Sequence, residues 1–100
     1  MSNPEQRLQA LSIDMVGLTM LLAAQYIEDH GWCRKRRQHD GAVCLLGALD
    51  KVGMRGHERR EAKRRIRKTV GSVVLWNNCK CQTKHDAVAA LRSAAIVREG

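Results

Sequence analysis

The chain has 100 residues, of which 44% are hydrophobic and only 3% aromatic, and it carries a formal net charge of +8 at pH 7. A chain of this length forms one hydrophobic core, which excludes two separate domains. Its aliphatic composition favours helix packing over a β-sandwich, and its longest uncharged stretch, residues 15–27, is too short to cross a bilayer.

The first predicted element is a long helix over about residues 4–30. Apolar residues recur there every three or four positions, which is the spacing of one helical face, and we expect that face to be buried. The face consists of Leu8, Leu11, Met15, Leu18, Leu22 and Tyr26. Pro4 suits the first turn, and Gly31 suits a left-handed C-cap.

A connecting loop follows, with a basic segment at residues 33–40 that ends at the turn signal Asp40-Gly41. The next stretch, residues 42–52, predicts a short helix that is almost wholly apolar. Because a helix that is apolar on most sides must be enclosed, we place this helix at the centre of the domain.

Residues 55–70 predict a basic helix after the break between two glycines. Ala62, Ile66 and Val70 are spaced four residues apart and form a narrow apolar stripe. The basic side chains spread over roughly half of the circumference, and Glu61 is placed to pair with Arg65. We therefore expect this helix to pack through its stripe and to expose its charges.

The C-terminal part of the chain predicts one more helix. Residues 72–76 are apolar and β-branched, and without a second strong strand we interpret them as a buried turn or helix end. Residues 77–82 predict a loop, and Thr83 predicts an N-cap with Asp86 in the first turn that follows. The chain as a whole predicts an all-α fold, a small single-domain bundle of about four helices.

The positive charge is concentrated in two segments. Residues 55–68 hold eight of the eighteen Lys and Arg residues and residues 34–37 hold four, while elsewhere six basic residues face eight acidic ones. Focused charge rich in arginine, which binds phosphate bidentately, is typical of a protein with an anionic partner. The candidate binding residues are Arg34, Lys35, Arg36, Arg37, Arg59, Arg60, Lys63, Arg64, Arg67 and Lys68.

The predicted partner is the backbone of a nucleic acid, DNA or RNA, contacted electrostatically. No aromatic residue interleaves with the basic helix, so base stacking on an aromatic platform has little support. The alternative is an acidic host protein that the same basic face would inhibit or modulate, and simple solvation of a charged helix is a third interpretation. We expect no membrane partner.

The cysteine and histidine residues offer weaker signals for chemistry. Cys79, Cys81 and His85 are possible zinc ligands, but their spacing is unorthodox and favours free thiols, so we expect no metal and no other cofactor. Cys44 near a helix start suggests a nucleophile, with His39, His57 or His85 as its base, yet its apolar surroundings favour core packing. We expect a protein that is not an enzyme.

The first residues lack the basic-then-apolar order of a signal peptide, which predicts a cytoplasmic protein with reduced cysteines.

Four segments in one order carry a resemblance to a known family: YIEDHGW (26–32), CLLGALDKVG (44–53), LWNN (75–78) and TKHDAVAALRSAA (83–95). Together they resemble a family of small uncharacterised proteins from actinobacteria and their phages. The resemblance implies a compact helical fold, a phage or mobile-element origin and hence the host cytoplasm, and it supplies no catalytic residue. The matching Trp32, Cys44, Gly47, Trp76 and Asn77 look structural. Asn78, the Cys79-x-Cys81 pair and the basic run depart from the family pattern.

Overall fold

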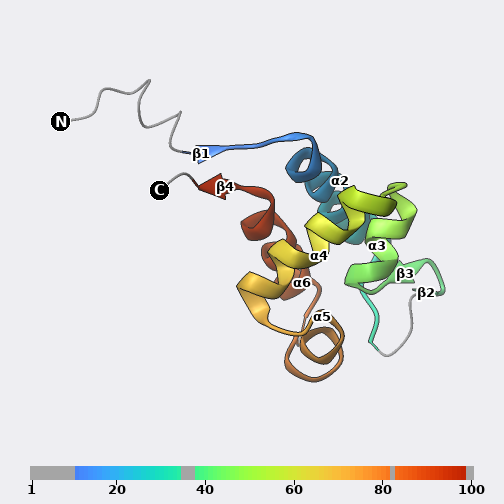
Figure 1. Cartoon of the computed structure of the whole chain (residues 1–100). Helices are drawn as coiled ribbons and strands as arrows, with labels where there is room; N and C mark the ends of the chain where they lie inside the picture. The colour runs from blue at the N-terminus through green and yellow to red at the C-terminus, as the bar shows by residue number, and fades with distance from the viewer. Residues whose placement is uncertain (1–10, 35–37, 82, 99–100) are drawn as a thin grey trace.

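The computed structural model describes residues 11–34, 38–81 and 83–98 of the chain (Figure 1). In chain order its elements are β1 (Leu11–Ser12), α2 (Met15–His30), β2 (Gln38–His39), β3 (Ala42–Val43), α3 (Leu45–Lys51), α4 (Gly56–Val70), α5 (Val73–Leu75), the π-helix η1 (Trp76–Lys80), α6 (Lys84–Ala95) and β4 (Val97–Arg98). Every strand in the described part is two residues long and pairs with one other strand. The predicted all-α fold is confirmed, and α2, α3, α4 and α6 correspond to the four predicted helices.

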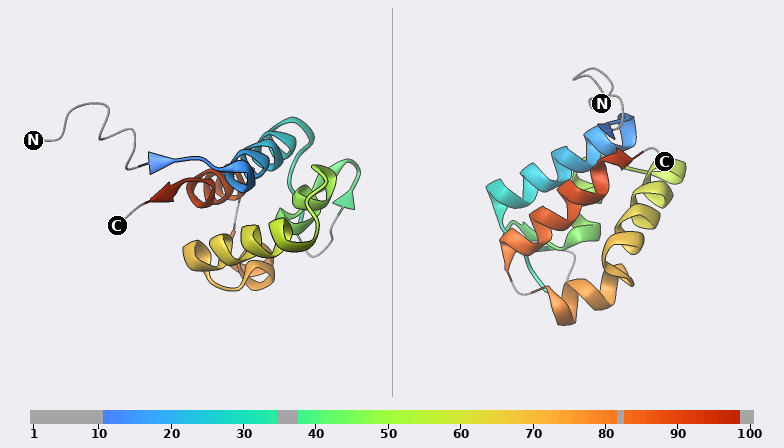
Figure 2. Two further views of the ribbon diagram at one scale, coloured as in Figure 1. Left: turned by 45° about the horizontal axis from the view of Figure 1, so that its top comes forward. Right: turned by 90° about the vertical axis from the view of Figure 1, so that its left-hand side faces the viewer.

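Helices α2 and α6 lie side by side and run in opposite directions (Figure 2). Their close approach depends on Gly17, because a Cβ at this position would lie 2.2 Å from the carbonyl oxygen of Ala95. Strand β1, which precedes α2, pairs antiparallel with β4, which follows α6, so that Leu11 lies opposite Arg98. The helix pair and the strand pair therefore form one continuous antiparallel unit.

The buried face of α2 differs from the predicted one. Its buried residues are Gly17, Met20, Ala23, Ala24 and Ile27. Met15, Leu18 and Leu22, which we expected in the core, are 71, 48 and 55% exposed. The predicted stripe was wrong at these three positions, whereas Tyr26 packs against the core. Helix α2 is apolar around most of its circumference, and close packing against α6 selects the face that carries the small residues.

Helix α2 also begins later than predicted. Its N-cap is Asp14, whose Oδ1 accepts a hydrogen bond from the backbone N–H of Gly17 at 2.8 Å. Residues 11–12 form β1 instead of a helical turn, and the predicted start at Pro4 lies outside the described residues. The glycine C-cap is confirmed, because Gly31 has a φ of 100° and donates its N–H to the carbonyl oxygen of Ile27.

The apolar segment 42–52 divides between a strand and a helix. Its first two residues form β3, which pairs with β2 across the predicted turn at residues 40–41, where φ is 48° and 85°. Cys44 then caps α3, and its Sγ accepts a hydrogen bond from the N–H of Gly47 at 3.3 Å. The helix is shorter than predicted, and four of its seven residues are buried. It packs mainly against α2, whereas α6 packs against both α2 and α4, so the prediction that it is the centre of the domain was wrong.

Helix α4 packs against α6 and α2 through the apolar stripe predicted from the sequence. Ala62 and Ile66 are fully buried, and Val70 is half-buried. The helix ends at Gly71, whose φ is 84° and whose N–H donates to the carbonyl oxygen of Arg67 at 2.8 Å. The packing of this narrow stripe turns most of the charged side chains of α4 towards solvent.

The π-helix η1 replaces most of the loop predicted at residues 77–82, so the prediction of a loop was wrong for residues 77–80. Its wider turn is marked by the hydrogen bond from the N–H of Cys81 to the carbonyl oxygen of Trp76, five residues earlier, at 2.7 Å. The short helix α5 leads directly into η1, capped by the side chain of Ser72. In Figure 1 these two turns form the part of the molecule below α4.

The side chain of Asn77 joins η1 to the core. It is 3% exposed. Its Oδ1 accepts hydrogen bonds from Trp32 Nε1 at 2.8 Å and from the N–H of Leu45 at 3.2 Å. Its Nδ2 donates to the carbonyl oxygen of Cys33 at 3.3 Å and to Asn78 Oδ1 at 3.1 Å. One amide therefore connects the segment after α2, the start of α3 and η1.

The last helix begins as predicted. Thr83 is the N-cap of α6, and its Oγ1 accepts a hydrogen bond from the N–H of Asp86 at 3.1 Å. The carboxylate of Asp86 accepts one from the N–H of Thr83 at 3.2 Å, which completes a reciprocal capping box. The buried face of α6 consists of Ala87, Val88, Ala90, Leu91, Ala94 and Ala95.

Candidate functional site

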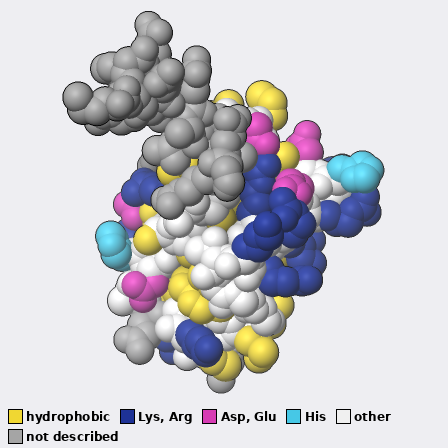
Figure 3. All heavy atoms as spheres, turned by 60° about the vertical axis from the view of Figure 1, so that its left-hand side comes forward, with side chains coloured by type: hydrophobic (Ala, Val, Ile, Leu, Met, Phe, Trp, Pro, Cys, Tyr) yellow, Lys and Arg dark blue, Asp and Glu magenta, His cyan; other side chains and the backbone are white. Residues whose placement is uncertain are grey.

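Four basic side chains share the solvent-facing side of α4. They lie at positions i, i+3, i+4 and i+7, which fall on one face of an α-helix. We call them the basic face: Arg60, Lys63, Arg64 and Arg67. In Figure 3 dark-blue side chains gather on the side of the molecule where the right-hand view of Figure 2 places α4.

Two other arginines of α4 are held in ion pairs with carboxylates of neighbouring segments. Arg59 Nε lies 3.0 Å from Oδ1 of Asp50 in α3, and Arg65 donates from both Nη atoms to the two carboxylate oxygens of Asp14. These arginine side chains are only 22% and 14% exposed. Arg59, which we predicted to contact a partner, is therefore engaged within the protein, and both pairs fix α4 in place.

We expect the pair of Asp14 and Arg65 to make the stability of the protein depend on pH in the acid range. The hydrogen bonds from Arg65 and from the N–H of Gly17 lower the pKa of Asp14 from 3.8 to about 2. Between these values the unfolded chain binds more protons at Asp14 than the folded one does. The contribution of Asp14 to the free energy of unfolding is therefore constant above about pH 5 and falls as the pH falls towards 2. Denaturant unfolding measured at several pH values checks this.

The variant Asp14→Asn should show a flatter dependence over the same range, because its side chain does not titrate. Glu58→Gln removes an exposed carboxylate from the same helix as Arg65 and serves as the control. An unchanged slope in Asp14→Asn would contradict the assignment.

Glu61 lies between two arginines, as predicted in part by its spacing from Arg65. Arg64 donates to its carboxylate from Nε at 2.9 Å and from Nη2, and Arg65 donates from Nε at 3.3 Å. The hydrogen bond from Arg64 lowers the pKa of Glu61 to about 2, so this carboxylate is ionised at neutral pH. Since Arg65 also pairs with Asp14, the two arginines are balanced by two carboxylates, although the Arg64 side chain is 54% exposed.

The basic face encloses a surface hollow of about 320 Å³, the basic hollow, lined by Arg60, Lys63, Arg64 and Arg67 alone. A second hollow, of about 370 Å³, shares Arg64 and continues towards α6, where Arg65, Lys68, Thr69 and Ser93 contribute polar groups. Arg64 therefore separates two hollows that both present positive charge. The two together form a basic track across α4.

Most cations of this track keep their charge available. In the described part of the chain, Lys63, Arg67 and Lys68 make no ion pair. Arg60 Nη2 lies 3.3 Å from Nδ1 of His57, which is not a carboxylate and does not offset the arginine charge. The resulting surface attracts anions, because like charges held within one hollow add their potentials.

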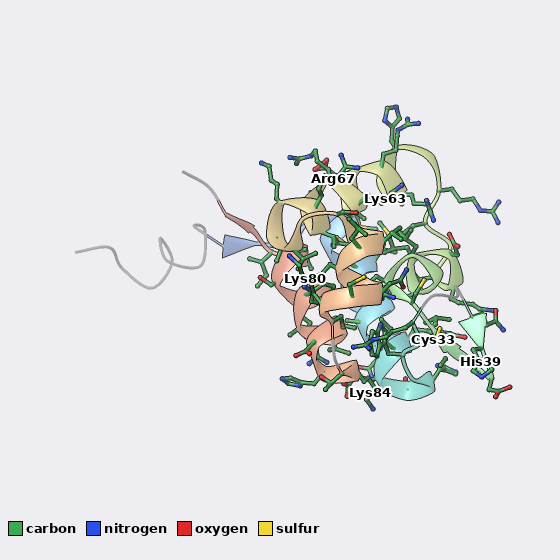
Figure 4. All side chains as sticks on the ribbon, turned by 90° about the horizontal axis from the view of Figure 1, so that it is seen from below. Cys33, His39, Lys63, Arg67, Lys80 and Lys84 are labelled. Carbon is green, nitrogen blue, oxygen red and sulfur yellow. The ribbon has the colours of Figure 1, made fainter. Side chains whose placement is uncertain are left out.

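The basic loop lies elsewhere on the molecule. Arg34 donates from Nε to the carbonyl oxygen of Cys81 at 3.1 Å, and its guanidinium carbon lies 5.4 Å from the centre of the Trp32 ring. In Figure 4 Cys33 and His39, which flank the loop, are well separated from Lys63 and Arg67. The structure thus separates Arg34 from the basic face. The predicted contact residues Lys35, Arg36 and Arg37 lie outside the described residues.

The structure disperses the candidate metal ligands. Cys79 is exposed, whereas Cys81 is fully buried, with its Sγ bonded to the carbonyl oxygen of Thr83 at 3.4 Å. Burial raises the pKa of the Cys81 thiol, which disfavours the thiolate that zinc requires. His85 is exposed at the start of α6. The described residues contain no group of three or more His, Cys, Asp or Glu side chains that would hold a metal ion.

Cys44, the candidate nucleophile, has a structural role as the cap of α3. Its sulfur accepts the N–H of Gly47, and its side chain is half-buried. The sequence offers no reason to expect a sulfur cap, because serine, threonine, aspartate and asparagine are the usual N-cap residues.

A third hollow, of about 290 Å³, lies beside the basic hollow and was not anticipated from the sequence. We call it the apolar hollow; it is lined by Leu46, Lys63, Arg67, Ser72, Val73 and Val74. Its walls come from α3, from α4 and from α5 with its cap. The only sequence signal was the run of apolar residues at 73–75, which we expected to be buried.

None of the helices in the described part combines the length and the apolar content needed to cross a bilayer. Comparison with known proteins gives one informative result. The model of DUF6197, described as a family of unknown function, matches residues 19–97. No curated protein and no solved structure matches the chain. The match confirms the coarser part of the resemblance, which was to an uncharacterised family.

Proposed function

We propose that this chain, which belongs to DUF6197, a family of unknown function, binds the phosphate backbone of nucleic acid. The binding surface is the basic face of α4. The observation that carries this proposal is the basic hollow, which is lined by four cationic side chains, of which Arg64 pairs with the carboxylate of Glu61. Three of them are arginines, whose planar guanidinium groups bind phosphate oxygens bidentately.

The hollow towards α6 extends the same surface. Lys68 adds a cation, and the hydroxyl group of Ser93 lines the same space, whereas the Thr69 hydroxyl donates to the carbonyl oxygen of Arg65. Hydroxyl and guanidinium groups together are the usual protein donors to phosphate and sugar oxygens. The basic track therefore suits a polyanion that passes across α4, with successive phosphates on either side of Arg64. We place this activity in the cytoplasm as part of the proposal.

The first expected result is a steep dependence of affinity on salt. Neutralising about four phosphates should give a plot of log affinity against log salt concentration with a slope of roughly −3 to −4, because each contact releases a condensed counterion. Fluorescence anisotropy with labelled oligonucleotides across a salt series measures this slope. An unrelated protein of equal net charge is the charge control, and affinity no greater than that of the charge control would contradict the proposal.

A matched pair of triple variants separates the basic face from net charge. Arg60→Gln/Lys63→Gln/Arg67→Gln removes three cations of the face and should lower affinity at least about tenfold while making the slope shallower by roughly 2 to 3. Lys51→Gln/Lys84→Gln/Arg92→Gln removes three exposed cations elsewhere and should change affinity far less. Figure 4 shows Lys84 well separated from Lys63 and Arg67.

Equal losses in the two triple variants would reduce the interaction to net charge. In that case, an acidic host protein becomes the partner to search for, since the same face would suit an acidic surface. A pull-down from nuclease-treated lysate identifies such a partner if it is recovered with the parent protein and lost with the variant of the basic face.

A further inference from the structure

We infer that the bound nucleic acid is single-stranded and that one unpaired base enters the apolar hollow beside the basic face. This inference rests on the proposed function and adds the chemical class of its ligand. It follows from the position of Lys63 and Arg67, which line both the charged basic hollow and the neighbouring apolar hollow.

Lys63 and Arg67 line both the basic hollow and the apolar hollow. They lie one helical turn apart on α4, about 6 Å along its axis. In Figure 4 they lie next to each other on the side of α4 that adjoins α5. A phosphate held between these two cations is therefore at the edge of the apolar hollow. Any group bonded within a few ångströms of that phosphate is placed to enter it.

The apolar hollow presents accessible aliphatic surface. Val74 is 52% exposed, Leu46 is half-buried, and Val73 forms a buried part of the wall. The hydroxyl of Ser72, which lines the same space, accepts the N–H of Leu75 at 3.4 Å and retains its own proton for donation. The hollow thus offers aliphatic walls, one hydroxyl donor and two cations at its rim.

An unpaired nucleotide matches this combination. Its phosphate is anionic, its base has apolar faces and a polar edge, and the two are joined through one sugar. At about 290 Å³ the hollow is at the small end of ligand sites, so it suits one ring system rather than several. The guanidinium of Arg67 at the rim is also suited to stack on a base.

A duplex cannot place a base in the apolar hollow, because its bases are paired and stacked inside the double helix. It reaches the basic face through its phosphates and leaves the apolar hollow empty. The hollow itself has fixed walls, since α5 continues into η1 and Asn77 anchors η1 to the core. A single strand therefore gains a contact that a duplex lacks.

The test compares three labelled probes that carry the same number of phosphates: a single-stranded DNA oligomer, the same backbone with abasic sites, and a duplex of half the length. The base-bearing strand should bind about tenfold more tightly than the abasic strand, with the same salt slope, because only the contact with bases differs. A ribonucleotide strand of the same sequence shows which sugar is preferred. Equal affinity for the base-bearing and abasic strands, or tighter binding of the duplex, overturns the inference.

Variants locate the contact. Val74→Asn makes the wall polar without adding charge and, at an exposed position, should leave the fold intact; it should weaken binding of the base-bearing strand several-fold and leave abasic binding unchanged. Leu18→Asn, at a 48% exposed position on α2, is the matched control and should change neither. If the abasic strand still binds with a steep salt slope, the proposed function stands even when this inference fails. If this protein binds no probe more tightly than the charge control does, both fail.

Discussion

Replacing Asn77 with alanine is expected to lower the free energy of unfolding by about 4 kcal/mol. The change removes the acceptor of the Trp32 indole N–H and of the Leu45 N–H, and the donor to the Cys33 carbonyl. Each buried polar group left without a partner costs about 1 to 3 kcal/mol. A domain of this size is stable by about 5 to 15 kcal/mol in total, so the variant should be at the margin of folding. Urea denaturation followed by tryptophan fluorescence measures the difference.

Two further variants separate the hydrogen bonds from the volume of the side chain. Asn77→Asp keeps the shape and the acceptor but turns a carboxylate oxygen towards the Cys33 carbonyl, which was the acceptor of an N–H. It should therefore destabilise the protein almost as strongly as alanine does. Trp32→Phe leaves only one bond unmade and should cost less than Asn77→Ala. A loss below about 1 kcal/mol in Asn77→Ala would contradict the role of this amide as an anchor.

Gly17→Ala is expected to cost about 2 kcal/mol, although alanine is the better helix former. The intrinsic preference for alanine over glycine inside a helix contributes about 1 kcal/mol in the opposite direction. This preference is outweighed by a steric clash, because a Cβ at position 17 would lie 2.2 Å from the carbonyl oxygen of Ala95. That atom belongs to the backbone of α6, so relief requires the two helices to separate, and overpacking of this kind typically costs 1 to 3 kcal/mol.

The neighbouring substitution Leu18→Ala provides the comparison. It removes three carbon atoms from a side chain that is 48% exposed, so it should change the free energy of unfolding less than Gly17→Ala does. Thermal unfolding of the two variants beside the parent protein ranks them. The reverse order would mean that α2 and α6 move apart without loss, and that the close approach at Gly17 does not stabilise the fold.

Local signals predicted several elements well. The Thr83 cap with Asp86, the glycine end of α2 and the apolar stripe of α4 all depend on residues within one or two turns, and all are confirmed. These features are determined by interactions between residues that are close in the sequence, so they can be predicted from the sequence alone.

Features that depend on distant partners were missed. The buried face of α2 is chosen by contact with α6, and an apolar pattern that surrounds the helix contains no information about that choice. Asn77 was expected to be structural, but its partners were not predicted. Leu45 precedes it by 32 positions in the sequence and Cys33 by 44. Neither separation leaves a pattern in one sequence.

The candidate site shows the same division. The basic helix and its exposed side were predicted from spacing alone, whereas the partners that occupy Arg59 and Arg65, Asp50 and Asp14, come from other elements. The apolar hollow arises where α3, α4 and α5 meet. Its walls were visible in the sequence only as apolar residues that we expected to be buried.

The pairing of β1 with β4 brings the first and the last strand of the described chain side by side. Leu11 and Arg98 lie opposite each other in antiparallel register, so the chain enters and leaves the fold at neighbouring points, about 5 Å apart. Such a fold can be inserted into a surface loop of another protein without forcing the ends of that loop apart. For the same reason, a reporter attached beside either strand experiences nearly the same surroundings, at a place formed by β1 and β4 rather than by the basic face.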